Sequence, residues 1–163
     1  MSNITVREAS AEDLSSLLRL EQRIIDSERP YDPFLKEDDV SYYDIPNLIS
    51  DSDSHLIVLE SDSEIVGSGY AQIRQSSLCH MHEKHCYLGF IYLEPTFRGK
   101  ALGKIIVDAL KEWGIKKGMQ HFQLNVYREN ESAIRAYEKA GFNKVSVMME
   151  LIVRNPETQL CIS

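Results

Sequence analysis

The feature that most constrains the fold is a change of hydrophobic period between residues 86 and 113. Residues 86–93 (CYLGFIYL) are apolar on both faces, which is typical of a central β-strand. Glu94-Pro95 ends this strand, and from Leu102 to Trp113 the apolar side chains recur at helical spacing. A buried strand followed directly by an amphipathic helix predicts an α/β fold with a strand–helix–strand crossover.

The same patterns predict the other elements along the chain. Alternation predicts strands at 4–7, 55–60, 65–74, 121–127 and 145–153, and helical spacing predicts helices at 13–28, 38–50, 102–117 and 130–140. Pro46 lies inside the second helix and weakens it, and Gly67 and Gly69 indicate a bulge or a close backbone approach in their strand. The order βααββ–βαβαβ predicts a mixed α/β sheet in a single domain over residues 1–153, followed by a loose polar tail at 154–163.

Charge is distributed unevenly over a chain whose net charge is −7. Residues 1–64 hold 16 acidic and five basic side chains, whereas residues 94–118 hold six basic and three acidic ones. The acidic total argues against nucleic-acid binding, which needs a basic face. It permits a cationic substrate together with one local anionic ligand, and solubility alone is the alternative explanation.

Targeting features are not evident, so we expect a cytoplasmic protein. No apolar run approaches the roughly 20 residues that a membrane helix needs, and the N-terminal residues lack the pattern of a signal peptide. The three cysteines, Cys79, Cys86 and Cys161, are expected to be reduced thiols because their spacing forms no disulfide framework.

Two glycines and three cations occupy the start of the helix that follows the central strand, at residues 98–104 (RGKALGK). Unpaired N–H groups at a helix start and the positive end of the helix dipole bind phosphate or pyrophosphate. Glycine lets such a ligand approach the backbone, and Arg98, Lys100 and Lys104 add charge. Neither a Walker loop nor a dinucleotide fingerprint is present, and a solvated basic helix start remains the alternative.

This stretch resembles the acetyl-coenzyme A loop of the GNAT superfamily of N-acetyltransferases, R/Q-x-x-G-x-G/A after a strand that ends in an apolar residue and proline. Residues 130–142 (NESAIRAYEKAGF) resemble the second signature of that family, N-x-x-A-x-x-x-Y-x-x-x-G-F. The two motifs occur in the family's order and spacing, and the resemblance covers roughly residues 4–153. It implies an enzyme that moves an acetyl group from acetyl-CoA to a primary amine by direct attack in a ternary complex, without a metal.

The resemblance also implies roles for individual residues. The backbone of residues 91–93 would pair with the pantetheine arm, the amides of 98–104 would hold the pyrophosphate, and Tyr137 would lie near the sulfur as general acid. Alternatively, Tyr137 is an aromatic residue of the core. The residues expected to bind the cofactor are Ile91, Tyr92, Leu93, Arg98, Gly99, Lys100, Ala101, Leu102, Gly103, Lys104, Asn125 and Asn130.

The sequence departs from the family pattern at the loop and at the general base. Ala101 stands where the family has glycine, and we expect it to be tolerated with ordinary helical dihedrals. Asn125 and Tyr87 occupy the positions where family members carry a catalytic carboxylate, and neither can accept a proton at neutral pH. His85, Glu94, Asp32 or an ordered water chain could serve instead.

Several other groups have two interpretations. An aromatic and acidic set could form a pocket for an ammonium group or could simply pack against a helix; it comprises Tyr31, Asp32, Tyr42, Tyr43 and Asp44. His80, His82 and His85 have spacing that a metal could use, but no pattern completes a site, so a polar loop is expected. A non-catalytic acyl-CoA-binding domain and a plain interaction module are the rival functions, and a homodimer is left open.

Overall fold

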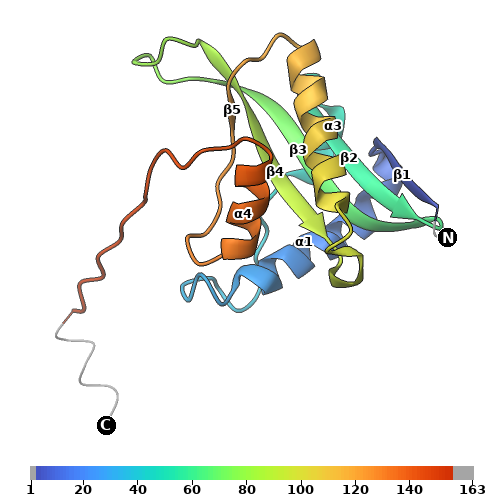
Figure 1. Ribbon diagram of the computed structural model, residues 1–163. Coiled ribbons are helices and arrows are strands. Elements are labelled where there is room, and N and C mark those ends of the chain that lie inside the picture. The colour runs from blue at the N-terminus through green and yellow to red at the C-terminus, as the bar shows by residue number, and fades with distance from the viewer. Residues whose placement is uncertain (1–2, 156–163) are drawn as a thin grey trace.

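The structure is a computed structural model that describes residues 3–155, and its centre is one five-stranded sheet. The strands follow one another in the order β1-β2-β3-β4-β5, with β1 to β4 antiparallel and β5 parallel to β4 (Figure 1). Their bounds are β1 Ile4–Glu8, β2 Ser54–Ser61, β3 Glu64–Gln75, β4 Lys84–Leu93 and β5 Phe122–Gln123. The mixed α/β sheet expected from the sequence is therefore confirmed, with β4 in the interior of the sheet.

Helices cover both faces of this sheet and create two cores. One face carries α1 (Leu14–Glu28), which follows a 3₁₀ turn at Ala11–Asp13, and the short helix α2 (Ile45–Ser50). The other face carries α3 (Leu102–Lys116), and α4 (Glu131–Lys139) lies beside β4 (Figure 1). Leu20 and Phe90 are buried in the α1 core, and Leu88 and Ile106 in the α3 core. Cys86 and Leu88 of β4 enter the α3 core and Phe90 and Tyr92 enter the α1 core, so this strand is held between the two cores.

The second helix is shorter than the sequence suggested. Helical spacing predicted residues 38–50, but α2 begins only at Ile45. The Asp44 side chain accepts the N–H of Asn47 at 3.1 Å, and Pro46 lies in the first turn, where its missing N–H costs nothing. The preceding segment is held instead by Glu21 of α1, as described below.

The C-terminal part of the prediction is wrong in two places. The strand expected at 121–127 is paired only at Phe122 and Gln123. The strand expected at 145–153 is not part of the sheet: the segment is irregular and its side chains are exposed. Alternating apolar residues form a strand only where they pair with a sheet edge, and within residues 3–155 this segment pairs with none. Residues 156–163 of the expected tail lie outside the described residues.

Glycines allow α3 to approach the sheet closely, as their position in a strand had suggested. A Cβ atom at Gly69 would lie 2.7 Å from Ile106 Cγ2 and 3.0 Å from Leu110 Cδ1, so any larger residue would push α3 away. At the other end of the helix, a Cβ at Gly114 would lie 2.6 Å from the Phe122 ring. The beginning of α3 is thereby set against β3 and β4, next to the end of β4.

Two further sequence expectations concern membranes and thiols. Among residues 3–155, no helix is long and apolar enough to cross a membrane. Cys79 is an exposed free thiol, and Cys86 is a buried one whose pKa burial raises to about 11. Cys161 lies outside the described residues. A thiol with so high a pKa is protonated at neutral pH, so Cys86 is a core residue and not a nucleophile.

Candidate active site

The edge of β4 that faces away from β3 is open along most of its length. β5 pairs with β4 only at Cys86 and Tyr87, so from Leu88 to Leu93 no described strand adjoins this edge. Unpaired N–H and C=O groups on such an edge can bind an extended molecule as if it were another strand. The three residues expected to hold the pantetheine arm, Ile91, Tyr92 and Leu93, lie at the end of this open edge.

A β-bulge distorts β4 just before those residues. Gly89 pairs with Tyr70 and Tyr92 pairs with Ser68, so Phe90 and Ile91 face the single residue Gly69. Phe90 has φ of +50°, an unusual value for a bulky side chain, and its carbonyl accepts a hydrogen bond of 2.9 Å from the Ser68 hydroxyl. A bulge bends its strand and changes where the following backbone groups point. The backbone strain at Phe90 therefore lies just before Ile91–Leu93, at the end of the open edge of β4.

The loop between β4 and α3 presents backbone N–H groups without a side-chain cap. A 3₁₀ turn at Pro95–Phe97 leads into it, and no side chain caps the first N–H groups of α3. Gly99 and Ala101 have positive φ values, 76° and 60°. Lys100, which lies between them, does not have a positive φ. Such alternation turns successive N–H groups toward one side, as in an anion-binding nest. A Cβ at Gly103 would meet nothing within 4 Å, so the space above the helix start is open.

Ala101 does not have the dihedrals expected from the sequence. It was expected to be helical, but its φ of +60° and ψ of +12° place it in the left-handed region. The glycine that Ala101 replaces would adopt this conformation freely, whereas alanine is strained there by roughly 1–2 kcal/mol. The loop keeps the shape that a glycine would give it, at a cost in stability.

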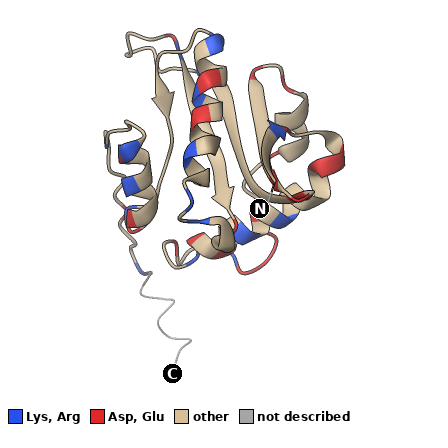
Figure 2. Ribbon diagram, turned by 45° about the vertical axis from the view of Figure 1, so that its right-hand side comes forward, with Lys and Arg blue, Asp and Glu red and all other residues tan. Residues whose placement is uncertain are grey.

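Basic side chains surround this helix start (Figure 2). The Arg98 side chain folds back, its Nε donating to the Leu93 carbonyl at 2.9 Å, and its guanidinium lies 5.6 Å from the Tyr92 ring centroid. Lys100 is exposed, with its ammonium 5.7 Å from the Phe97 ring. Lys104 forms an ion pair with Asp108 one turn later. Arg98 thus fixes the loop to the strand end, and Lys100 remains as an exposed cation at the helix start.

The second signature folds into α4, across from β4. Asn130 is its N-cap, because its Oδ1 accepts the N–H of Ala133 at 3.3 Å, which leaves the side-chain NH₂ to face a ligand. Asn125 lies in the exposed, irregular stretch after β5. The structure therefore gives Asn130 a helix-capping role that the sequence reasoning missed, although its position before E-S-A signals an N-cap.

Tyr137 is half-buried on α4, and burial raises the pKa of its hydroxyl to about 12, with smaller contributions from Glu28 and Tyr87. Its ring also packs edge-on to Phe142, with centroids 6.1 Å apart. The hydroxyl therefore stays protonated over the whole physiological range. Tyr137 therefore lies near Glu28 at the end of α1 and near Tyr87 of β4.

All three side chains considered as the base already have hydrogen-bond partners. Glu94 is buried, and its Oε2 accepts from Arg23 at 2.7 Å and from the Tyr92 hydroxyl at 3.4 Å. His85 lies at the opposite end of β4 from Leu93, with its Nδ1 2.8 Å from the Ser76 hydroxyl. Asp32 is half-buried and accepts from the Tyr127 hydroxyl at 3.2 Å. Of these three, only Asp32 lies near a neighbour of Tyr137: it is close to Glu28, and Glu28 is close to Tyr137.

Glu28, the last residue of α1, was missed from the sequence because nothing in its neighbourhood marks it. Burial raises the pKa of its carboxyl group, and the nearby Asp32 raises it further. Glu28 in turn raises the pKa values of the tyrosines that surround it, after the larger effect of their own burial; these are Tyr42, Tyr43, Tyr127 and Tyr137. A carboxylate pair enclosed by aromatic rings is a suitable site for an ammonium group.

The tyrosine segment is positioned by a buried carboxylate. Glu21 of α1 is almost completely buried, and its Oε1 accepts the N–H groups of Tyr42 at 2.7 Å and Tyr43 at 2.9 Å. The Tyr43 ring stacks on Phe90, with centroids 4.6 Å apart. The Tyr42 hydroxyl is buried beside Glu28 and Tyr127, and both groups raise its pKa after the larger effect of its own burial.

Asp44 does not join this group, because it is exposed and caps α2. Tyr31 does, since its ring lies 5.9 Å from that of Tyr127. The acidic and aromatic set therefore consists of Glu28, Asp32, Tyr31, Tyr42, Tyr43 and Tyr127, which we call the acceptor cluster.

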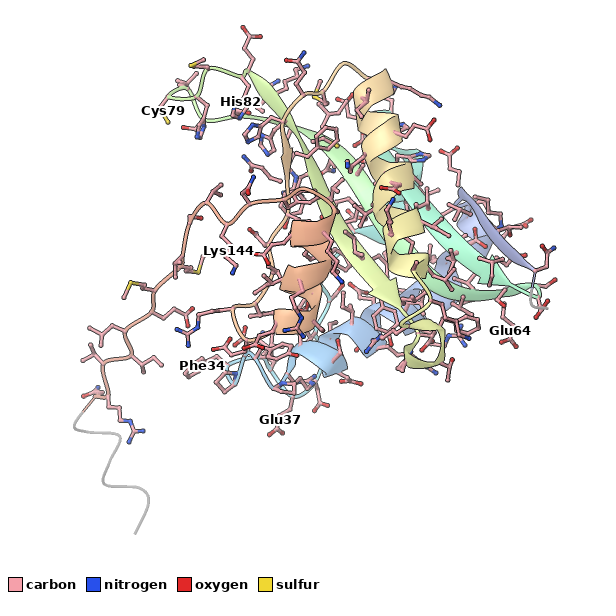
Figure 3. The ribbon with its side chains drawn as sticks, viewed as in Figure 1. Phe34, Glu37, Glu64, Cys79, His82 and Lys144 are labelled. Atoms are coloured by element: carbon pink, nitrogen blue, oxygen red, sulfur yellow. The ribbon has the colours of Figure 1, made fainter. Side chains whose placement is uncertain are left out.

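Four of the five histidines, all except His55, lie together at the far end of β4 from Leu93, where Figure 3 labels His82. The His82 ring stacks on His121 with centroids 3.8 Å apart, and His80 stacks on His82 at 5.0 Å. The Nε2 atom of His82 is buried, and no hydrogen-bond partner of it lies among the described residues. The residues that the structure describes contain no group of three or more side chains that could hold a metal ion.

The sequence between residues 16 and 142 matches the family model described as the acetyltransferase (GNAT) family. Among curated proteins, a thialysine N-epsilon-acetyltransferase of Sus scrofa is 25% identical over 149 residues, which are 86% of this chain and 85% of that protein. An uncharacterized N-acetyltransferase of Methanocaldococcus jannaschii is 28% identical over 78 residues, which are 48% of this chain and 31% of that protein.

Solved structures share the fold over nearly the whole chain. A tetramutant of the BH1408 protein from Bacillus halodurans has a TM-score of 0.80 and 21% identity, covering 91% of this chain and 99% of that one. A predicted acetyltransferase from Clostridium acetobutylicum, solved with acetyl-CoA, has a TM-score of 0.72 and 18% identity, covering 92% and 96%. At this level of identity the likeness extends to the fold alone.

Proposed function

Because this chain belongs to the acetyltransferase (GNAT) family, we propose that it transfers the acetyl group of acetyl-CoA to a primary amine by direct attack within a ternary complex. The observation that carries this proposal is the open edge of β4 leading directly into the uncapped start of α3. The edge suits the amide-bearing pantetheine arm, and the helix start suits the diphosphate.

Cofactor binding would use main-chain groups more than side chains. The backbone of Ile91–Leu93 pairs with the arm, and the N–H groups between Gly99 and Lys104 bind the diphosphate. Lys100 adds a cation, and the NH₂ group of Asn130 reaches the cofactor from α4. No residue here needs a metal, because the acyl carbon of a thioester is already activated.

The chemistry requires a short series of group movements. The amine nitrogen forms a bond to the acyl carbon, the carbonyl oxygen becomes negative, and the bond from carbon to sulfur then breaks. A backbone N–H at the end of β4 stabilises the oxyanion. The Tyr137 hydroxyl donates a hydrogen bond to the developing thiolate. With a pKa of about 12, against roughly 8.5 for a thiol, it does not give up its proton fully, and water reprotonates the sulfur.

The acceptor is proposed to be a cationic amine. Glu28 and Asp32 supply negative charge, and the tyrosines surround it, with the Tyr42 hydroxyl beside Glu28 and the Tyr127 hydroxyl bonded to Asp32. Since no unengaged carboxylate lies at the family's usual base positions, water at the acceptor cluster accepts the ammonium proton. The relative named for thialysine acetylation supports an acceptor with an amine on a flexible chain.

The decisive experiment pairs CoA binding with thiol release. Gly103→Asp and Gly103→Asn differ only in charge, and neither meets a protein atom within 4 Å at its Cβ. An acid at the helix start favours the helix dipole but repels a diphosphate. We therefore expect calorimetry to show CoA binding weakened at least about tenfold more by aspartate than by asparagine, with no loss of thermal stability. Equal CoA binding by both variants would show that the diphosphate does not bind at the start of α3.

The rival function is a non-catalytic acyl-CoA-binding domain, favoured by the missing carboxylate base. Release of free thiol from acetyl-CoA across a panel of mono-, di- and polyamines separates the two. Binding without turnover on any amine supports the rival. Turnover that is faster with polycationic acceptors supports the acetyltransferase with an acidic acceptor site.

A further inference from the structure

We propose that Arg74 binds a carboxylate of the acceptor, so that the amine which this protein acetylates is an amino acid. The inference rests on the proposed function and deepens it, because it adds a second point of recognition to the acceptor site. It combines two observations. One is an arginine that is held in a fixed orientation without a carboxylate partner, and the other is a series of aromatic rings that leads from this arginine to the acceptor cluster.

The Arg74 side chain, near the end of β3, is half-buried and well ordered by its neighbours. Its guanidinium carbon lies 3.8 Å from the centroid of the Tyr87 ring, and its Nε donates to Oε1 of Gln72 at 2.8 Å. The contact of Nη2 with the Tyr70 hydroxyl is longer, at 3.3 Å, and contributes little. The Tyr87 ring and the Gln72 amide therefore determine where the guanidinium points.

Gln72 is itself oriented by a chain of polar contacts. Its Nε2 donates to the Ser54 hydroxyl at 3.0 Å, and that hydroxyl donates to the Asp51 carboxylate at 2.6 Å. Because the amide NH₂ group of Gln72 is used by Ser54, the amide oxygen faces Arg74. An arginine that is held in this way loses little conformational freedom when a ligand binds to it.

The charge of Arg74 is not neutralised by the part of the chain that the structure describes. None of the ion pairs among residues 3–155 includes Arg74. The Tyr87 ring stabilises the cation but accepts none of the hydrogen bonds that lie in the guanidinium plane. The Nη1 end of this plane therefore remains for a planar acceptor with two oxygens, and a carboxylate has that geometry.

Aromatic rings connect Arg74 with the acceptor cluster on the α1 side of the sheet. The centroid of the Tyr87 ring, over which the guanidinium lies, is 6.3 Å from that of Tyr70. The Tyr70 ring in turn lies 5.8 Å from the ring of Tyr43, which belongs to the cluster. A ligand that contacts the cluster can therefore extend over neighbouring rings to reach the guanidinium.

The two ends of this series carry opposite charges. Glu28 and Asp32 make one end negative, and Arg74 makes the other end positive. Tyr137 lies near both ends, since Glu28 and Tyr87 each raise its pKa after the larger effect of its own burial. A molecule with an ammonium group and a carboxylate binds both ends and keeps its amino group beside Tyr137, whereas an amine without a carboxylate uses the acidic end alone.

The test uses pairs of acceptors that differ in one carboxylate. Glycine and methylamine, β-alanine and ethylamine, ornithine and putrescine, and lysine and cadaverine are such pairs. In at least one pair, thiol release from acetyl-CoA should give a kcat/KM at least about tenfold higher for the amino acid, as expected for one charge-assisted pair of hydrogen bonds. If no pair showed this preference, the proposal would be overturned while acetyl transfer to amines remained.

Variants of Arg74 show whether the preference comes from this side chain. Arg74→Gln should lower kcat/KM for the preferred amino acid to the value for its matched amine, with unchanged constants for that amine and for acetyl-CoA. Arg74→Lys, which keeps the charge without the planar fork, should restore part of the preference. Arg19→Gln is the matched control, because Arg19 also has no ion pair within residues 3–155 and donates to the Ile65 carbonyl on α1's side of the sheet at 3.2 Å. An equal loss for amino acid and amine in Arg74→Gln would mean a structural role only and would overturn the proposal.

Binding measured without turnover separates this proposal from the proposed reaction. Calorimetry in the presence of CoA, which carries no acetyl group, should show tighter binding of the amino acid than of its matched amine, and Arg74→Gln should abolish the difference. If this difference is found but no amine is acetylated, Arg74 is a carboxylate site and the proposed reaction is wrong. If amines are acetylated but calorimetry shows no difference, the reaction stands and the role of Arg74 is overturned.

Discussion

The Arg23 guanidinium lies 2.7 Å from the Glu94 carboxylate and so ties the middle of α1 to the residue that follows β4. Glu94 is buried, whereas about half of the Arg23 side chain is exposed. The pair joins one core helix to the strand end on which the proposed cofactor site depends. The ion pair also engages Glu94, the only carboxylate residue next to Leu93 in the sequence.

Replacing this carboxylate separates a structural role from a catalytic one. We expect Glu94→Gln to lower the free energy of unfolding by about 1–2 kcal/mol, since the partner is half-exposed and a neutral amide still accepts a hydrogen bond. The shape of the pH–rate profile should not change. Chemical denaturation and thiol-release kinetics measure the two effects. A fall of about 10²-fold in turnover at constant stability would instead make Glu94 the base.

The protein should be at least as stable when Ala101 is replaced by the glycine that the family has at this position. Ala101→Gly removes about 1–2 kcal/mol of left-handed strain and adds up to about 1 kcal/mol of unfolded-chain entropy, so stability should stay equal or rise by about 1 kcal/mol. Ala109→Gly, inside the same helix, should lose about 1 kcal/mol or more. Denaturant titration of both variants checks the sign. Equal losses would show that Ala101 is not strained.

Tyr137 is expected to act through its hydroxyl alone. Tyr137→Phe should lower kcat by about 10²–10³-fold, the usual effect of losing one donor to a developing charge, while CoA affinity stays constant. Tyr70→Phe, whose hydroxyl contacts Arg74 at 3.3 Å, is the control. Because the pKa of Tyr137 is raised to about 12, kcat should rise as the amine loses its proton and show no descending limb below about pH 11. A descending limb near pH 9 would mean that another group is the donor.

Glu28 should determine affinity for the acceptor. Glu28→Gln is expected to raise KM for a diamine by about tenfold to a hundredfold, the equivalent of one charged hydrogen bond, with little change in KM for acetyl-CoA. Asp26→Asn, on the same helix but exposed and paired with Arg29, should leave both constants unchanged. Initial rates with a diamine and with a neutral hydroxylamine-type nucleophile distinguish charge recognition from misfolding. An equal rise in KM for both nucleophiles would show that Glu28 does not recognise the charge of the acceptor.

The sequence was most informative where one pattern depends on local chemistry alone. The end of β4 follows from Pro95, and the start of α3 follows from the helical spacing after Leu102. Features set by tertiary packing were not predictable. Glu28 is one of 25 acidic residues, and only its burial against distant tyrosines distinguishes it.

Pattern alone also overestimated regular structure at the C-terminus. Residues 145–153 have an apolar side chain at every odd-numbered position, but a strand forms only where it pairs with a sheet edge, and the sequence of the segment does not show whether it does. The prediction of helical dihedrals for Ala101 was wrong because this residue is the N-cap of α3 and takes a left-handed conformation, which alanine does not prefer.

The stacked histidines should make the protein less stable in mild acid. Burial lowers the pKa of His82 and of His85 below the usual 6.5, helped by His121 and Arg74 respectively. Below about pH 6.5 the unfolded chain therefore binds more protons than the folded one, so stability is complete above that value and is lost as the pH falls further. The thermal midpoint should drop between pH 7 and pH 5, and His85→Gln should flatten this slope. A slope that His85→Gln leaves unchanged would assign the acid sensitivity to other groups.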